Sequence, residues 1–316
     1  MYIYFTQFRR NDPPIGGPYI WTKEKKIAFV SSYYYFSGKK QRNPLSVYQD
    51  CFRYLVGNLT DDVDFYFYTN NESYHILQPP TKANLYVNFT YESPYDICNL
   101  RRYEKDYDYI ASIHKPGYLL TGFLGAVWNS KICLLDDIRR KGIYKYLFWV
   151  DAGLVKKSNY SWAQIPAIER VDYLFSKHKK LLFTLRPRSR VLIRPVKYIP
   201  MEKLYITPFD VVIANFFGGP VETIEYTMDL FFKYHDFYLK QKQNILREEF
   251  IYSALLLYHP DKYMGIHSIT KKCWYPGPGI FLISNNNRCR FPNALHTIGV
   301  RNHMFVLIAE KLDYWM

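Results

Sequence analysis

The residues best placed to do chemistry follow a very apolar segment of the chain. Asp151-Ala-Gly153 comes directly after Tyr146–Val150. Five consecutive apolar residues predict a buried strand, and in an open parallel sheet ligands bind beyond the carboxyl ends of the strands. Asp151 could meet a ribose hydroxyl or a divalent cation that holds a diphosphate, and Gly153 would let the backbone approach closely. Asp is also a common loop residue, so a purely structural role stays open.

Small and polar residues end other predicted strands. Ser31 and Ser32 follow the apolar run Ile27–Val30, and Thr69 follows Asp64–Tyr68. Because the carboxyl ends of parallel strands share one edge of a sheet, these hydroxyls could line a base and ribose pocket near Asp151.

Lys131 could bring a positive charge to the same edge. It lies in a segment over 121–141 whose composition predicts one helix, and an ammonium there could pair with phosphate. The alternative is an exposed helix lysine. Gly218 and Gly219 lie in a predicted loop after the strand 211–214, where they could make room for a sugar or acceptor. Their alternative is a turn before a helix that begins near Pro220.

Glu248 and Glu249 stand near the start of an otherwise apolar helix predicted over 247–258. A carboxylate there could act as a general base. It could equally stabilise the helix dipole. Adjacent helical side chains point about 100° apart, so only one of the two can face Asp151.

The elements that must position these residues alternate between strands and helices. Further strands are predicted at Leu85–Phe89 and 181–185, and further helices at 44–59 and 220–243. A strand, helix, strand order is typical of a parallel sheet covered by helices. The sequence therefore predicts an α/β fold.

Composition narrows the function classes. The 316 residues carry a formal net charge of +14, with 48% hydrophobic and 19% aromatic residues, which excludes a disordered or fibrous chain. The charge calls for an anionic partner, so a non-catalytic protein that binds nucleic acid or an anionic surface is the rival hypothesis. The basic residues are scattered and form no nucleic-acid motif, which makes a nucleic-acid partner the weaker reading; peripheral membrane contact is compatible with the charge.

The cysteines and the apolar segments indicate the cellular compartment of the protein. Five cysteines without a CxxC spacing predict reduced thiols, and we expect no zinc site. We find no signal peptide and no run of about 18 apolar residues, so the expected location is cytoplasmic, with membrane-peripheral binding as an option.

Four segments together resemble the HtrL/YibB-like family of glycosyltransferases and, more broadly, GT-A glycosyltransferases. They are Trp128-Asn-Ser-Lys131, Phe148-Trp-Val-Asp-Ala-Gly153, Asn215-Phe-Phe-Gly-Gly219, and Arg247-Glu-Glu249 with His259-Pro260. The resemblance spans roughly Lys26 to Tyr263. It implies a GT-A (Rossmann-like) three-layer α/β/α sandwich with a mostly parallel central sheet. The implied organisation is an N-terminal arm over 1–25, a nucleotide-sugar-binding catalytic domain over 26–265, and a C-terminal extension over 266–316 that packs on the same domain.

The same resemblance implies transfer of a hexosyl or pentosyl group from a nucleotide-diphosphate sugar to a hydroxyl acceptor, such as a glycan or lipid-linked glycan. Enzymes of this type carry a DxD motif that meets the ribose and a Mn²⁺ or Mg²⁺ diphosphate, but this chain has Asp151-Ala-Gly153. His296 and Arg301 resemble a C-terminal HxxGxxK segment and could supply a second metal ligand and a contact to the diphosphate. The family's acidic pair favours Glu249 as the base and Glu248 as helix-terminal support. An inactive GT-A scaffold remains a third hypothesis.

Overall fold

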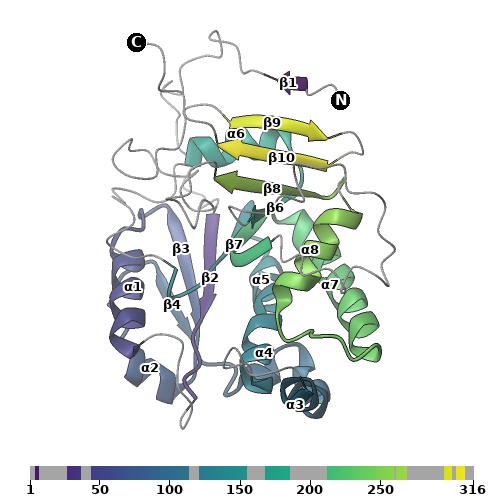
Figure 1. Cartoon of the computed structure of the whole chain (residues 1–316). Coiled ribbons are helices and arrows are strands. Elements are labelled where there is room, and N and C mark those ends of the chain that lie inside the picture. Colours follow the sequence, from purple (N-terminus) through teal and green to yellow (C-terminus); the bar gives the residue numbers. More distant parts are fainter. Residues whose placement is uncertain are drawn as a thin grey trace.

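The computed structural model describes residues 4–6, 27–36, 44–113, 121–154, 168–185, 212–259, 261–268, 295–300 and 304–309. One ten-stranded sheet runs through them (Figure 1). Its strands, in sheet order, are β1 (Tyr4–Thr6), β9 (Leu295–Val300), β10 (Met304–Ala309), β8 (Tyr263–Ser268), β6 (Leu181–Leu185), β7 (Val212–Pro220), β5 (Tyr146–Val150), β2 (Ile27–Ser32), β3 (Val63–Tyr68) and β4 (Leu85–Asn88).

The sheet is mostly parallel, as predicted. Following the pairings from strand to strand, eight of the ten described strands run in one direction, and β7 and β9 run against it. The run β4-β3-β2-β5 is wholly parallel, and β2 and β5 lie side by side at its inner end. From β2 the chain proceeds outward to β3 and β4 and then returns to β5, so the strand order reverses between β2 and β5. Such a reversal is where open α/β sheets bind ligands.

Helices cover both faces of the sheet, which confirms the three-layer α/β/α prediction (Figure 1). The strands present alternate residues to the two faces: Phe29 and Phe148 pack on one side, Ala28 and Leu147 on the other. The first face packs against α1 (Leu45–Gly57), α2 (Asn71–Leu77) and α6 (Ile168–Lys177). The second packs against η1 (Pro94–Tyr103), α3 (Glu104–Ile113), α4 (Gly122–Asn129), α5 (Lys131–Arg139), α7 (Glu222–Lys240) and α8 (Glu248–Tyr258).

The helix predicted over 121–141 is interrupted and forms α4 and α5. Asn129 and Ser130 stand at the junction, and both side chains bond to backbone carbonyls: Asn129 to Gly125 and Ile245, Ser130 to Val127. Such side chains compete with the regular helix ladder. The interruption makes Lys131 the first residue of α5.

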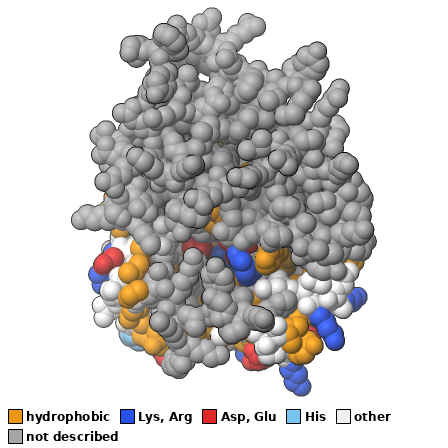
Figure 2. All heavy atoms as spheres, in the orientation of Figure 1, with side chains coloured by type: hydrophobic (Ala, Val, Ile, Leu, Met, Phe, Trp, Pro, Cys, Tyr) orange, Lys and Arg blue, Asp and Glu red, His pale blue; other side chains and the backbone are white. Residues whose placement is uncertain are grey.

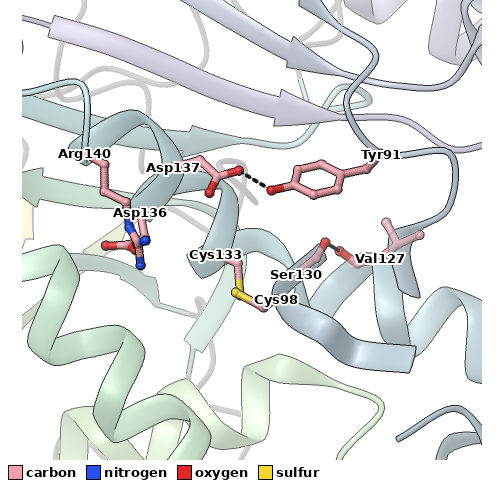
Figure 3. Close-up of a disulfide and its surroundings, with 8 residues drawn as sticks. All are labelled: Tyr91, Cys98, Val127, Ser130, Cys133, Asp136, Asp137 and Arg140. Carbon is pink, nitrogen blue, oxygen red and sulfur yellow. Dashed lines mark hydrogen bonds and ion pairs between the residues drawn. A yellow bond between two sulfur atoms is a disulfide. The ribbon is translucent and has the colours of Figure 1, made fainter. Parts of the chain in front are cut away.

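Cys98 and Cys133 form a disulfide that ties η1 to α5 (Figure 3). The expectation of reduced thiols is wrong for this pair. The two cysteines are 35 residues apart in sequence, yet their Cα atoms lie 6.1 Å apart, a distance that a disulfide spans. Nearby, the Tyr91 hydroxyl donates to Asp137 at 2.7 Å (Figure 3). The pairing depends on how η1 packs against α5, which no local spacing reveals.

The segments at the two ends of the chain contribute strands to the same sheet. β1 belongs to the predicted arm over 1–25 and pairs with β9, and β8 crosses the predicted boundary between 265 and 266. The division into arm, catalytic domain and extension stays a prediction. In the described part of the chain, no helix combines the length and apolarity needed to cross a bilayer.

Candidate functional site

Asp151 lies at the carboxyl end of β5, where the strand order reverses. Tyr146–Val150 is the buried strand that the sequence predicts. The Asp151 N–H donates to the Asn215 carbonyl on β7 at 2.9 Å, while β2 pairs with β5 on the other side. The side chain is 36% exposed, in contrast to the buried strand before it. Asp151 therefore presents a carboxylate at the edge where ligands of α/β folds bind.

Lys131 is a buried cation that holds this carboxylate. Its side chain is 3% exposed, and Nζ lies 2.9 Å from Asp151 Oδ1 and 2.7 Å from Glu248 Oε1. Nζ also donates to the Ala214 carbonyl at 2.9 Å. An ammonium has three donors, so these three acceptors saturate it. Lys131 lies at the same edge as Asp151, as the sequence suggested, but it pairs with the carboxylate itself, and the ammonium has no donor left for the suggested phosphate contact.

The electrostatics of this cluster follow from burial. Burial alone lowers the pKa of Lys131, but Asp151 and Glu248 more than reverse this and raise it above its usual value. Burial raises the pKa of Glu248 to about 7, while Lys131 acts in the opposite direction and Glu249 and Asp151 add to the rise. Lys131 therefore stays charged, and Glu248 can gain or lose a proton near neutral pH.

Glu248, rather than Glu249, faces the cluster. The expectation that Glu249 would be the residue beside Asp151 is wrong in its geometry, because the first turn of α8 turns Glu248 inward onto Lys131. Glu249 instead lies 2.6 Å from Arg247, and its side chain is 17% exposed. The Glu248 and Glu249 side chains point in different directions because adjacent positions on a helix are rotated by about 100°. Sequence alone could not choose, because both glutamates border the same apolar helix.

Trp149 belongs to the site, although the sequence pattern indicated no separate role for it. Its indole Nε1 donates to Asp151 Oδ1 at 2.6 Å, and its ring lies under Lys131, with Nζ 5.5 Å from the ring centroid. Residues two apart on a strand point to the same face, so the Trp-x-Asp spacing was the available signal. Oδ1 thus accepts from both Trp149 and Lys131. No described residue bonds to Oδ2.

Three further polar side chains near this edge are buried and lack a hydrogen-bond partner among the described residues. They are the hydroxyls of Ser31 and Ser32 and Oδ1 of Asn215. The register pairs Val30 with Trp149, which puts Ser32 one strand away from Asp151 and on the same face. Buried polar groups in proteins nearly always form hydrogen bonds, so these three groups are candidates to bind a ligand or a water molecule. The Thr69 hydroxyl, in contrast, donates to the Tyr33 carbonyl at 2.8 Å. This bond joins the segment after β3 to the segment after β2.

The glycines have packing roles. Gly218 and Gly219 lie inside β7, not in a loop, and pair with Phe148 and Leu147, away from the end of β5 that carries Asp151. Their φ values are 151° and 158°, and a Cβ on Gly218 would collide with the Leu147 carbonyl, so strand packing requires glycine. The expected acceptor loop at these two residues is wrong. At Gly153 a Cβ would come within 2.9 Å of the Tyr48 ring.

The described residues do not fit a divalent metal. They contain no group of three or more His, Cys, Asp or Glu side chains that could surround an ion. Both carboxylates of the cluster are bound to the Lys131 ammonium, whereas Mg²⁺ needs an octahedron of oxygen ligands at about 2.0–2.1 Å and Mn²⁺ also prefers several oxygen ligands. His296 lies in β9, five strands from β5, or roughly 24 Å at the usual strand spacing. The expectation that His296 and Asp151 share a metal is therefore wrong. Arg301 lies outside the described residues.

On the face in Figure 2, basic and acidic side chains lie close together near the centre of the view, with apolar side chains on both sides.

Comparisons with known proteins find similarity only among solved structures. No family model matches the chain, and no curated protein matches it. A crystal structure of mouse xyloside xylosyltransferase 1 in its apo form is similar at 10% sequence identity and a TM-score of 0.43, covering 78% of this chain and 88% of that one. Similarity at this level assigns neither a family nor an activity, and membership of the HtrL/YibB-like family stays a prediction.

Proposed function

We propose that this chain is a GT-A-type glycosyltransferase that moves a sugar from a nucleotide-diphosphate sugar to a hydroxyl acceptor. The observation that carries the proposal is the position of Asp151. It is a partly exposed carboxylate at the reversal point of a mostly parallel sheet, held by a buried lysine and flanked by buried polar groups that have no partner among the described residues. This combination suits a nucleoside bound by its hydroxyls across the ends of β2 and β5.

Transfer requires the acceptor hydroxyl to lose a proton as its oxygen attacks the anomeric carbon. The bond from that carbon to the diphosphate breaks, and the nucleoside diphosphate leaves. For an inverting reaction we propose Glu248 as the base, in place of Glu249, because its raised pKa of about 7 suits proton transfer near neutral pH. The Glu249 carboxylate is instead paired with Arg247 at 2.6 Å.

Ser31 and Ser32 are proposed to contact the ribose or base, and Asp151 the hydroxyls of the donor. The acceptor is proposed to be a glycan or a lipid-linked glycan, which leaves the sugar transferred and the nucleotide to experiment. Arg301 keeps its proposed role at the diphosphate from the sequence resemblance.

The test is donor turnover by the purified full chain. A panel of UDP-, GDP- and ADP-linked sugars is incubated with the protein, and release of nucleoside diphosphate is followed with and without simple glycoside acceptors. We expect release from one nucleotide class, lost in Asp151→Asn and kept in Asp64→Asn, a matched change at the opposite end of the sheet. Equal turnover in wild type and Asp151→Asn would reject the role of Asp151, and no release from any donor would count against the proposed function.

A further inference from the structure

The Asp151 cluster already contains the cation that its carboxylates need. The Lys131 ammonium lies within 3 Å of both Asp151 and Glu248, which is where a metal shared by the two carboxylates would otherwise bind. Its third donor is fixed on the Ala214 carbonyl, so the ammonium cannot swing aside without leaving a buried acceptor unpaired.

Charge in the cluster balances without an added ion whenever Glu248 holds its proton. Lys131 contributes one positive charge and Asp151 one negative charge. Glu248, whose side chain is 4% exposed, is the residue that burial favours in its neutral form. A divalent ion placed beside Lys131 would add two positive charges within a few ångströms of an ammonium, a repulsion that a single free carboxylate oxygen offsets poorly.

The free acceptors around the cluster suit hydroxyl groups. Asp151 Oδ1 is occupied by Lys131 and Trp149, which fixes the carboxylate plane, and Oδ2 has no partner in the described part of the chain. Ser32, whose hydroxyl also has no partner there, lies one strand away on the same face. An ionised carboxylate only accepts hydrogen bonds, while a serine hydroxyl both donates and accepts. Together they complement sugar hydroxyls, which also donate and accept.

We infer that Asp151 binds hydroxyls of the donor's ribose or sugar directly, and that the Lys131 ammonium occupies the position between the two carboxylates where a divalent cation would otherwise bind, so that donor binding through Asp151 requires no metal. This inference rests on the proposed function, because it names how the same site would hold its donor. It differs from the sequence expectation of a Mn²⁺ or Mg²⁺ site at Asp151 and His296.

The experiment measures binding, not turnover. Affinities of the full chain for UDP, GDP, ADP and CDP, and for the matching nucleotide sugars, are determined by isothermal titration calorimetry in EDTA and again with Mn²⁺. We expect one nucleotide class to bind with affinities that agree within about twofold in the two conditions. In Asp151→Asn the affinity should fall roughly 10- to 100-fold in both, the loss that one hydrogen bond to a charged group implies.

Two arms identify which hydroxyl is bound. If Asp151 holds the ribose, the 2′-deoxy or 3′-deoxy form of the preferred nucleoside diphosphate binds weakly to wild type and is little affected by Asp151→Asn. If it holds the transferred sugar, Asp151→Asn weakens the nucleotide sugar and leaves the nucleoside diphosphate unchanged. Either result supports the inference.

Two outcomes overturn it. Binding that appears only with Mn²⁺ would show that a metal is required and would leave the proposed function intact. Absence of binding by every nucleotide and nucleotide sugar in both conditions would remove the proposed function and the inference with it. Direct Mn²⁺ binding, followed by the electron paramagnetic resonance signal of the free ion, gives an independent check: an ion bound by wild type and lost in Asp151→Asn would also overturn the inference.

Discussion

Two aspartate networks lie at opposite ends of the parallel part of the sheet. At the carboxyl end, Asp151 meets a lysine, an indole and, through the lysine, a second carboxylate. At the amino end, Asp64 on β3 accepts from the Tyr144 hydroxyl at 2.6 Å, and the Tyr144 and Tyr66 hydroxyls lie 2.8 Å apart.

The difference lies in what each network leaves unsatisfied. In the Asp64 network the described contacts are neutral hydroxyls: burial, and then the bond to Asp64, raise the pKa of Tyr144 far above its usual value, so its proton stays in place. The Asp151 network contains a permanent cation, a glutamate that titrates near neutral pH, and one carboxylate oxygen without a described partner. The first arrangement serves stability, and the second has the capacity to bind a ligand.

Loss of the central cation should have the largest effect. Lys131→Met leaves the buried Glu248 and the partly exposed Asp151 without their shared partner, and breaking a buried ion pair costs about 3–5 kcal/mol of unfolding free energy. The measurement is urea unfolding followed by circular dichroism. The matched control is Lys145→Met, which breaks the exposed pair with Asp172 and should cost less than about 1 kcal/mol. Equal losses in the two variants would contradict the buried role of Lys131.

Exchange of each aspartate for asparagine tests the comparison directly. Asp151→Asn should weaken nucleotide binding by the 10- to 100-fold given above and change stability little, because the side chain is 36% exposed. Asp64→Asn should show the reverse, with binding unchanged and a loss of about 1–2 kcal/mol in unfolding free energy, since a buried acceptor for Tyr144 is weakened. Calorimetry measures the nucleotide affinity of both variants, and urea unfolding measures their stability. A loss of nucleotide affinity in Asp64→Asn would contradict the assignment of binding to the Asp151 network alone.

Titration of Glu248 should give stability a pH dependence. Its pKa rises from 4.5 in the unfolded chain to about 7 in the fold, so between these values the folded state holds more protons. The contribution of Glu248 to the unfolding free energy should therefore be highest below about pH 4.5 and fall as pH rises toward 7, with a slope of at most about 1.4 kcal/mol per pH unit. Glu248→Gln should remove that part of the slope. Superimposable pH profiles of the variant and wild type would show that Glu248 does not titrate in this range.

Removal of the indole donor should have the smallest effect. Trp149→Phe keeps an aromatic ring on β5 but removes the bond to Asp151 Oδ1, so the carboxylate keeps Lys131 and loses part of its orientation. We expect nucleotide affinity to fall by roughly 3- to 10-fold, about 1 kcal/mol, with the fold retained. Calorimetry checks this. A loss as large as that of Asp151→Asn would mean that Trp149 contacts the ligand itself.

The local parts of the fold were predictable from the sequence. Apolar runs identified β2, β3 and β5, and the helix at 247–258 was found almost to the residue as α8. These patterns depend only on residues a few positions apart, so they can be recognised without knowledge of the tertiary structure. The same reasoning failed at Gly218 and Gly219, because glycines typical of a loop can also serve two strands that approach closely.

By itself the sequence determined that Asp151 would end a buried strand and that a lysine and two glutamates would accompany it in order along the chain. Only the tertiary structure decided that Lys131 is saturated by three acceptors, that Glu248 and not Glu249 meets it, and that Cys98 pairs with Cys133. Lys131 and Glu248 are more than a hundred residues apart, and their contact depends on how α5 and α8 pack on the same face of the sheet. Direction of a side chain around a helix is fixed by that packing, since a rotation of one residue position turns it by about 100°.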